Sequence, residues 1–200
     1  MLVEDQREWQ SRCRAGNTYS CFFCAKLRFL EEEYGPIRRV LDLTYGRGSF
    51  YLACRGRYEV VAVDIAKWDW LVEPTRFVQG DAFVVVEELA KAGERFDVAV
   101  IDPPYNTKLN HMLDDMAEWI SHGKEMWSVE RLVALIKRAR AIARHVLVKY
   151  QPKGWKELAP LFDMEPEHLF IFRTVKQRLF TNVDYYKNAT FLFHFVGKTE

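Results

Sequence analysis

Apolar, β-branched segments alternate with helical patterns along the chain, and they predict seven strands. The predicted strands cover residues 39–43, 58–64, 76–79, 96–101, 145–150, 167–172 and 189–195. The first, second, fourth and fifth are nearly continuous apolar runs, which is typical of strands buried on both faces of a sheet. Only a loop separates the last two strands, so we expect them to pair antiparallel, because a parallel pair needs a longer crossover.

Helical spacing of apolar residues fills the gaps between these strands. The predicted helices cover residues 21–33, 82–92, 129–143 and 155–162. This alternation predicts an α/β fold in which helices cover both faces of a mostly parallel, doubly wound sheet. The sequence contains no repeat, low-complexity tract or linker, so we expect one domain over residues 1–200, with an N-terminal helical segment at 1–36 and a core at 37–200.

Length and composition agree with a soluble globular protein. The chain has 200 residues, of which 49% are apolar, and this is enough for one domain with a buried core. No apolar run approaches the roughly 20 residues of a membrane-spanning helix. The charged N-terminus also lacks the apolar stretch of a secretory signal, so a cytoplasmic location is the default expectation.

The charge balance favours no class of partner, because 29 Lys and Arg stand against 28 Asp and Glu. Dedicated nucleic-acid binders are often strongly basic, so binding of nucleic acid here would need local positive charge. Two groups of basic residues are candidates for it: Lys137, Arg138, Arg140, Arg144, Lys149, Lys153 and Lys156, and then Arg173, Lys176 and Arg178. The alternative is a solvated helix face and a solvated loop.

Four cysteines raise the question of metal binding. Cys21 and Cys24 have the spacing of a zinc or iron–sulfur ligand pair, but only Cys13 lies nearby and no second such pair completes four ligands. We therefore predict no metal site and interpret these cysteines as small buried side chains on a helix. A metal or redox role remains the alternative, and a disulfide would be unusual in a cytosol outside a hyperthermophile.

Acidic residues recur at the ends of the first four predicted strands: Asp42, Asp64, Asp81 and Asp102. Open α/β sheets bind their ligands at the carboxyl ends of the strands, so these acids are candidate site residues. An acid in the place of Asp64 accepts hydrogen bonds from ribose hydroxyls, or else caps the following segment. Asp81 would accept from an adenine amino group, or cap the helix that begins at Ala82.

The turn after the first strand contains Gly46 and Gly48, which let the backbone pass close to a ligand. Tyr51 occupies the place of the third glycine in a dinucleotide-binding fingerprint, which counts against a nicotinamide cofactor.

The most specific signal is Asp102-Pro-Pro-Tyr105, directly after an apolar strand. Two prolines form a stiff turn that cannot continue a central strand. An exocyclic amino nitrogen is a poor nucleophile, and the Asp102 carboxylate with the Pro103 carbonyl could accept its two N–H bonds and direct its lone pair towards an electrophilic methyl group. Tyr105 offers a flat face on which a base could stack. The alternative is a purely structural turn with a buried tyrosine.

With these motifs the chain resembles the class I, Rossmann-like S-adenosylmethionine-dependent methyltransferases, and within them the amino-methylating group that includes N6-adenine methylases. The resemblance covers about residues 40–195 and implies a seven-stranded sheet, mostly parallel, with the last strand antiparallel. It implies S-adenosylmethionine as the cofactor and, as catalytic residues, Asp102, Pro103, Pro104 and Tyr105. The cofactor-binding residues that it implies are Asp42, Thr44, Gly46, Gly48, Asp64, Ile65, Asp81 and Ala82. Residues 17–20 lie where the family has a further cofactor-contacting motif.

The chain also departs from this group. Thr44 stands where a phenylalanine is frequent, and Arg47 stands between the two glycines. A separate target-recognition domain is missing, so a second copy of the chain or an accessory subunit is a candidate source of that surface. Partial substitutes are the segment 106–128, with Trp119, His122 and Trp127, and the loop 173–187.

The leading functional prediction is methylation of a nucleic-acid base, with adenine N6 in DNA or RNA as the target. Cytosine N4, guanine N2 in tRNA or rRNA, and the side-chain amide of a protein glutamine are alternatives with the same chemistry. A binding subunit without turnover is a further alternative, against which the intact Asp102 and Tyr105 argue.

Overall fold

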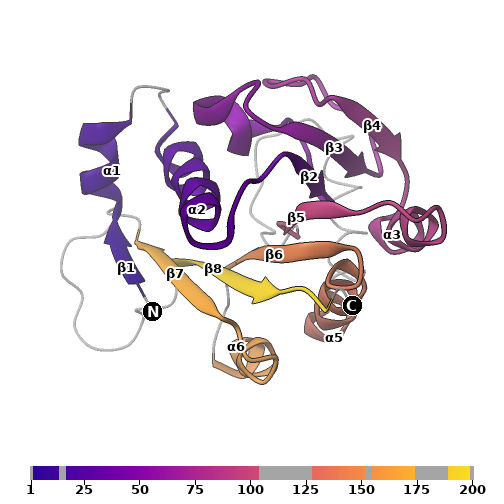
Figure 1. Cartoon of the computed structure of the whole chain (residues 1–200). Coiled ribbons are helices and arrows are strands. Elements are labelled where there is room, and N and C mark those ends of the chain that lie inside the picture. The colour runs from indigo at the N-terminus through magenta and orange to yellow at the C-terminus, as the bar shows by residue number, and fades with distance from the viewer. Residues whose placement is uncertain (1, 14–16, 104–127, 152–154, 174–188, 199–200) are drawn as a thin grey trace, which may run out of the picture.

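A computed structural model describes residues 2–13, 17–103, 128–151, 155–173 and 189–198. Its centre is one mixed sheet of eight strands in the order β1-β7-β8-β6-β5-β2-β3-β4 (Figure 1). The strands are β1 (Leu2–Asp5), β2 (Arg39–Asp42), β3 (Glu59–Asp64), β4 (Arg76–Gln79), β5 (Phe96–Ile101), β6 (Ala143–Tyr150), β7 (His168–Arg173) and β8 (Ala189–Val196).

All seven predicted strands are present, and the predicted mixture of directions is confirmed. The strands β4, β3, β2, β5 and β6 pair parallel, whereas β8 runs antiparallel to both β6 and β7. One strand was not predicted, because β1 adds to the edge of the sheet parallel to β7. The sequence predicts a helical segment over residues 1–36, whereas the structure has a strand as well as helices in that segment. Four residues in a charged context are too short to show strand periodicity, and their pairing with β7 is non-local.

The described helices are α1 (Gln6–Arg12), α2 (Thr18–Tyr34), α3 (Ala82–Lys91), α5 (Val129–Ala139) and α6 (Trp155–Phe162), with a 3-10 helix η1 (Ser49–Cys54). Each predicted helix is found, but the one predicted at 129–143 ends at Ala139. A tight turn follows, in which Ile142 donates to the carbonyl of Ala139, and β6 begins at Ala143. None of the helices in the described part of the chain has the length and apolarity needed to cross a membrane.

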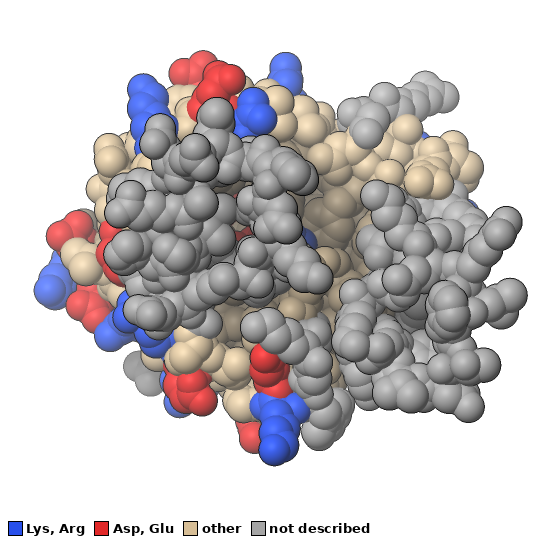
Figure 2. Space-filling view, turned by 180° about the vertical axis from the view of Figure 1, so that it is seen from behind, with Lys and Arg blue, Asp and Glu red and all other residues tan. Residues whose placement is uncertain are grey.

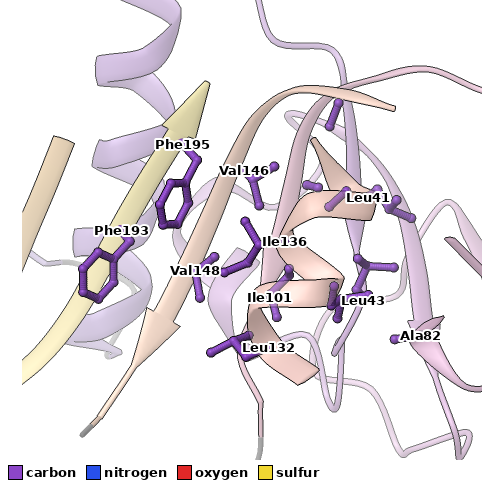
Figure 3. Close-up of a cluster of buried hydrophobic side chains, with 14 of the residues drawn as sticks. Leu41, Leu43, Ala82, Ile101, Leu132, Ile136, Val146, Val148, Phe193 and Phe195 are labelled. Atoms are coloured by element: carbon purple, nitrogen blue, oxygen red, sulfur yellow. The ribbon is translucent and has the colours of Figure 1, made fainter. Parts of the chain in front are cut away.

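Two hydrophobic clusters cover the two faces of the sheet, which explains why the central strands are apolar at nearly every position. On one face α3, α5 and α6 pack on the sheet, and Figure 3 shows Leu132 and Ile136 of α5 against Ile101, Val146 and Val148. On the other face α2 and η1 pack on the alternate side chains of the same strands (Figure 1). Loops follow the parallel strands at their carboxyl ends.

Lys26 of α2 anchors the added strand β1. Its ammonium group forms an ion pair with Glu4, and it lies 5.1 Å from the centroid of the Phe22 ring and 4.8 Å from that of Phe170. Glu4 also accepts a hydrogen bond of 2.7 Å from the indole of Trp9. The charge of the buried lysine is therefore compensated by one carboxylate and several aromatic faces.

The four cysteines form two disulfides, Cys13–Cys21 and Cys24–Cys54. Cys21 and Cys24 lie on α2 and Cys24 is buried, as expected, but all four cysteines are paired, a possibility that the sequence left open. The second disulfide joins α2 to η1, and no spacing rule identifies this pair because the packing of the two elements brings the sulfurs together. Within the described residues no group of three or more potential ligands is arranged to hold a metal ion.

Candidate active site

Three of the four predicted strand-end acids lie side by side, because β3, β2 and β5 are neighbours in the sheet. Asp42 and Asp64 are the last residues of β2 and β3, and Asp102 directly follows β5. Parallel strands place their carboxyl ends at one edge, so the acids meet there although they are far apart in sequence. This edge is the candidate active site.

Asp42 stabilises the first turn, which follows β2 and contains the two glycines. Its side chain is buried, and its carboxylate accepts hydrogen bonds from the Thr44 amide at 3.0 Å and from the Tyr51 hydroxyl at 2.9 Å. Burial raises the pKa of Asp42 to about 7, and these two hydrogen bonds oppose the shift. Tyr51, at the place of a third glycine, thus has a structural partner here. Direct contact of Asp42 with the cofactor stays a prediction.

The two glycines of the turn are required for different reasons. Gly46 and Gly48 both have positive φ, at 56° and 72°, which favours glycine. A Cβ at Gly46 would meet no atom of the described residues within 4 Å, whereas one at Gly48 would lie 2.5 Å from the hydroxyl of Tyr45. With respect to the described residues, Gly46 therefore borders open space, and Gly48 permits close packing. Arg47 between them is exposed and donates to the carbonyl of Asp69, away from the turn.

Asp64 closes the turn from the neighbouring strand. One oxygen of its carboxylate accepts a hydrogen bond of 2.8 Å from the Gly46 amide, and the other accepts one of 3.3 Å from the Ala66 amide. The carboxylate is half-buried at the sheet edge, beside the open space next to Gly46. The carboxylate is thus held in position by two backbone amides, and its contact with a ribose stays a prediction.

Asp81 lies at the start of α3 and acts as its N-cap. Its carboxylate accepts a 2.7 Å hydrogen bond from the Phe83 amide, so the capping role, one of two interpretations of the sequence, is present. Ala82 is buried, and the carbonyl of Ile65 accepts from the Gln79 side chain at 3.1 Å. These residues lie near the ends of β3 and β4, and their contact with an adenine stays a prediction.

Thr44 joins the turn that follows β2 to the segment that follows β5. The Asp102 amide donates to the Thr44 hydroxyl at 2.6 Å, so the residue that departs from the family pattern ties the two motifs together. The Asp102 side chain is 21% exposed, and Pro103 is buried beside it. Pro104 and Tyr105 lie outside the described residues, as do Trp119, His122 and Trp127.

Lys149 is the functional candidate that the sequence analysis missed. Its Nζ lies 2.8 Å from a carboxylate oxygen of Asp102, and its side chain is only 17% exposed. The ammonium group lies 5.0 Å from the centroid of the Tyr19 ring and 5.1 Å from that of Phe50. We had placed Lys149 in a basic run. A lysine within the apolar segment of residues 145–150 is the signal that could have separated it from that run.

Three arginines of that basic run have partners in the described part of the chain. Arg138 pairs with Glu87, Arg140 donates to the carbonyl of Val196, and Arg144 donates to Asp97. On the face shown in Figure 2, the described Lys and Arg side chains stand among Asp and Glu side chains. Lys153, Lys176 and Arg178 lie outside the described residues, and of Arg173 only the backbone is described.

The residues present fit S-adenosylmethionine. The open space beside Gly46, the acceptor Asp64 next to it and the capped N-terminus of α3 are arranged along one edge, with Asp102 one strand away. Together with the sheet, this edge has the position and the polar residues of a ligand-binding site in a Rossmann-like fold.

The comparisons identify the family. Residues 23–191 match the FtsJ-like methyltransferase family, so the chain belongs to that family. The matched model describes a family of methyltransferases.

Two relatives come from Methanocaldococcus jannaschii. One is named "Putative ribosomal RNA large subunit methyltransferase MJ1653" and is 40% identical over 80 residues, which are 33% of this chain and 20% of that protein. The other, named "Putative ribosomal RNA large subunit methyltransferase MJ1649", is 35% identical over 94 residues, which are 40% of this chain and 24% of that protein. The match thus spans a quarter or less of the length of these relatives.

Solved structures agree on the fold. The crystal structure of a SAM-dependent methyltransferase from Agrobacterium tumefaciens superimposes with a TM-score of 0.55 at 13% identity, and the match covers 92% of this chain and 64% of that one. At this identity the likeness concerns the fold alone.

Proposed function

We propose that the protein transfers a methyl group from S-adenosylmethionine to the exocyclic amino nitrogen of a nucleic-acid base, with adenine N6 in RNA as the target. The observation that carries this proposal is Asp102 at the end of β5, one strand from the turn with the open space. Its amide donates to Thr44, and its carboxylate accepts from Lys149. The proposed catalytic residues are Asp102, Pro103, Pro104 and Tyr105.

The reaction requires the protein mainly to position the target amino group relative to the methyl group. The cofactor, when bound, supplies an electrophilic methyl group. Asp102 would accept one N–H of the target amino group and the Pro103 carbonyl the other, so that the nitrogen lone pair points at the methyl carbon. A carboxylate offers about four lone-pair sites, so Asp102 can accept this bond in addition to the one from Lys149. Correct orientation alone can remove a large part of the barrier.

Cofactor binding is proposed for the remaining predicted residues. Gly46 and Gly48 would pass beside the methionine part, with Thr44 and Asp42 supporting the turn. Asp64 with Ile65 would meet the ribose, and Asp81 with Ala82 the adenine. In this arrangement the hydrogen bond from the Gly46 amide already orients the Asp64 carboxylate.

RNA is favoured over DNA as the acceptor by the names of the two Methanocaldococcus relatives, which describe ribosomal RNA methyltransferases. The target atom has no such support from relatives. Guanine N2, cytosine N4 and the side-chain amide of a protein glutamine can all donate two N–H bonds to the same pair of acceptors, and they remain alternative targets.

One observation favours a second candidate, methylation of a ribose 2′-hydroxyl. A hydroxyl must lose its proton as it is methylated, and a lysine amine beside the reaction site can accept that proton when it is neutral. Lys149 lies within hydrogen-bond distance of Asp102, so both groups would reach one acceptor hydroxyl. The 2′-hydroxyl is present in RNA and absent from DNA.

The test is methyl transfer from tritiated S-adenosylmethionine to three acceptors: in vitro transcribed large-subunit ribosomal RNA, unmethylated genomic DNA and a protein extract. Labelled material is digested, and the methylated product is identified by chromatography and mass spectrometry. We expect label in RNA, as N6-methyladenosine. Label only in 2′-O-methyl nucleosides would establish the second candidate instead, and label only in protein or in N2-methylguanosine would overturn the adenine assignment.

A further inference from the structure

Two aromatic rings from different elements meet at Lys149. Tyr19 belongs to the first turn of α2 and Phe50 to η1, and their ring centroids lie 5.2 Å apart. Both rings lie about 5 Å from the Lys149 ammonium group, which also donates to the Asp102 carboxylate at 2.8 Å. The lysine is thus held by a carboxylate and two ring faces.

The hydroxyl of Tyr19 does not explain its position. This oxygen is buried, and among the described residues it has no hydrogen-bond partner. Burial, and then the charge of Asp102, raise the pKa of Tyr19, so the side chain is a neutral phenol. The ring, in contrast, contacts Phe172 edge-on at 5.5 Å and faces Lys149. The contribution of Tyr19 at this edge is therefore its aromatic face.

Ser20 fixes the relative position of the two rings. Its hydroxyl donates to the carbonyl of Phe50 at 2.7 Å and accepts from the Ala53 amide at 2.9 Å. The disulfide Cys24–Cys54 joins the same two elements one turn further along α2. Three covalent or hydrogen-bonded links thus hold α2 against η1, and they hold Tyr19 and Phe50 in register.

We infer that Tyr19 and Phe50 form an aromatic seat that positions Lys149, and through it the Asp102 carboxylate, for methyl transfer. A cation over aromatic faces is held without competing for the carboxylate, because a ring accepts no proton and forms no ion pair. The seat therefore restricts Lys149 to the conformation that reaches Asp102. This inference rests on the proposed catalytic role of Asp102, and it assigns Tyr19 to the positioning of a catalytic residue rather than to cofactor contact.

The test compares Tyr19→Leu with Tyr19→Phe and with Phe22→Leu as a matched control. Phe22 lies on the same helix and packs against Tyr19 at 5.6 Å, but its ring faces Lys26. The acceptor is the one that the wild type labels in the assay above. We expect Tyr19→Leu to lower kcat about tenfold, equal to about 1.4 kcal/mol of barrier, with the KM for S-adenosylmethionine unchanged. Tyr19→Phe keeps the ring and should rescue kcat, and Phe22→Leu should lower stability without lowering kcat.

A second readout needs no acceptor. The aromatic rings should shift the side-chain 13C and 1H NMR resonances of Lys149, assigned by their absence in Lys149→Arg. We expect these resonances to move towards ordinary lysine values in Tyr19→Leu and to stay in Tyr19→Phe and Phe22→Leu. Unchanged Lys149 resonances in Tyr19→Leu would overturn the seat.

The remaining outcomes of the kinetic test also support or overturn the inference. If Tyr19→Phe loses as much kcat as Tyr19→Leu, the hydroxyl acts and the ring does not, and the inference is wrong. A raised KM for S-adenosylmethionine with normal kcat would return Tyr19 to cofactor binding. Asp102→Ala is measured in parallel: full activity of that variant defeats the proposed function, whereas its inactivity together with normal Tyr19→Leu kinetics defeats only the seat.

Discussion

Lys26 and Lys149 are held in the same manner in two regions of the molecule. Each is largely buried, pairs with one carboxylate and lies within 6 Å of at least two aromatic rings. Helix α2 contributes to both, since it supplies Lys26 with Phe22 to one and Tyr19 to the other. By bonding alone the two pairs are hard to tell apart.

Their surroundings separate them. Glu4 comes from the edge strand β1 and is further satisfied by Trp9, so its pair joins two structural elements. Asp102 follows β5 at the edge that also carries Asp42 and Asp64, and its backbone is held by Thr44. A buried ion pair is therefore weak evidence of function by its chemistry, and its position relative to the carboxyl ends of the parallel strands decides what it can do.

The largest expected difference is between the two carboxylates. Asp102→Ala should lower kcat about a thousandfold while S-adenosylmethionine binding is kept, because the target amino group loses an acceptor and the residues proposed to hold the cofactor are unchanged. Glu4→Ala should leave kcat within about twofold and lower the melting temperature. Transfer kinetics, calorimetric cofactor titration and thermal unfolding of both variants check this. Full activity of Asp102→Ala would refute the catalytic assignment.

The two lysines sharpen the comparison. Lys149→Met should lower kcat about a hundredfold, since Asp102 loses the group that orients it, whereas Lys26→Met should act on stability, by about 2 kcal/mol. Replacing both members of a pair then separates structure from function. Glu4→Leu with Lys26→Met should recover stability, because no charge is left unpaired, but Asp102→Leu with Lys149→Met should recover no activity. Denaturant unfolding and transfer rates measure the two.

Asp64 belongs to the same edge but is expected to serve the cofactor. Asp64→Ala should weaken S-adenosylmethionine binding about thirtyfold, since a ribose loses a charged acceptor and the Gly46 amide loses its partner. The kcat at saturating cofactor should change much less. Calorimetric titration gives the Kd, and a Kd equal to that of the wild type would show that Asp64 does not meet the cofactor.

Two buried histidines differ from the two buried lysines, because the histidines stay uncharged. Burial, followed by the charge of Arg144, lowers the pKa of His145 to about 4. Burial, followed by repulsion from His145 and His168 when they are protonated, lowers the pKa of His194 to about 3. Below the unfolded pKa of about 6.5 the unfolded chain binds protons that the folded protein does not, so stability falls as the pH drops from about 6.5 towards 4.

His194→Leu should remove one of these protons. The loss of stability between pH 7.5 and pH 5.5 should then be about 1 kcal/mol smaller than in the wild type. Unfolding by urea at both pH values measures it, and equal losses in the two proteins would contradict the assignment.

Much of the fold could be predicted because burial leaves a local pattern. The strands β2, β3, β5 and β6 are apolar at nearly every position, since helices cover both faces, and this placed them within two residues of their bounds. The strand β1 left no such pattern, because a short edge strand is defined by its pairing with β7. The same reason hid both disulfides, whose sulfurs come from separate elements.

The amino-acid sequence by itself determined the alternation of strands and helices, the two-glycine turn and the acids at the strand ends, because each is a local requirement of backbone or burial. Only the tertiary structure decided that Lys149 faces Asp102 and that Tyr19 and Phe50 lie against Lys149. These residues come from β6, α2 and η1. A lysine within an apolar strand marks Lys149 as unusual, but no local pattern identifies the residues that it contacts. The contact forms when α2 packs on the sheet, and packing is a property of the whole chain.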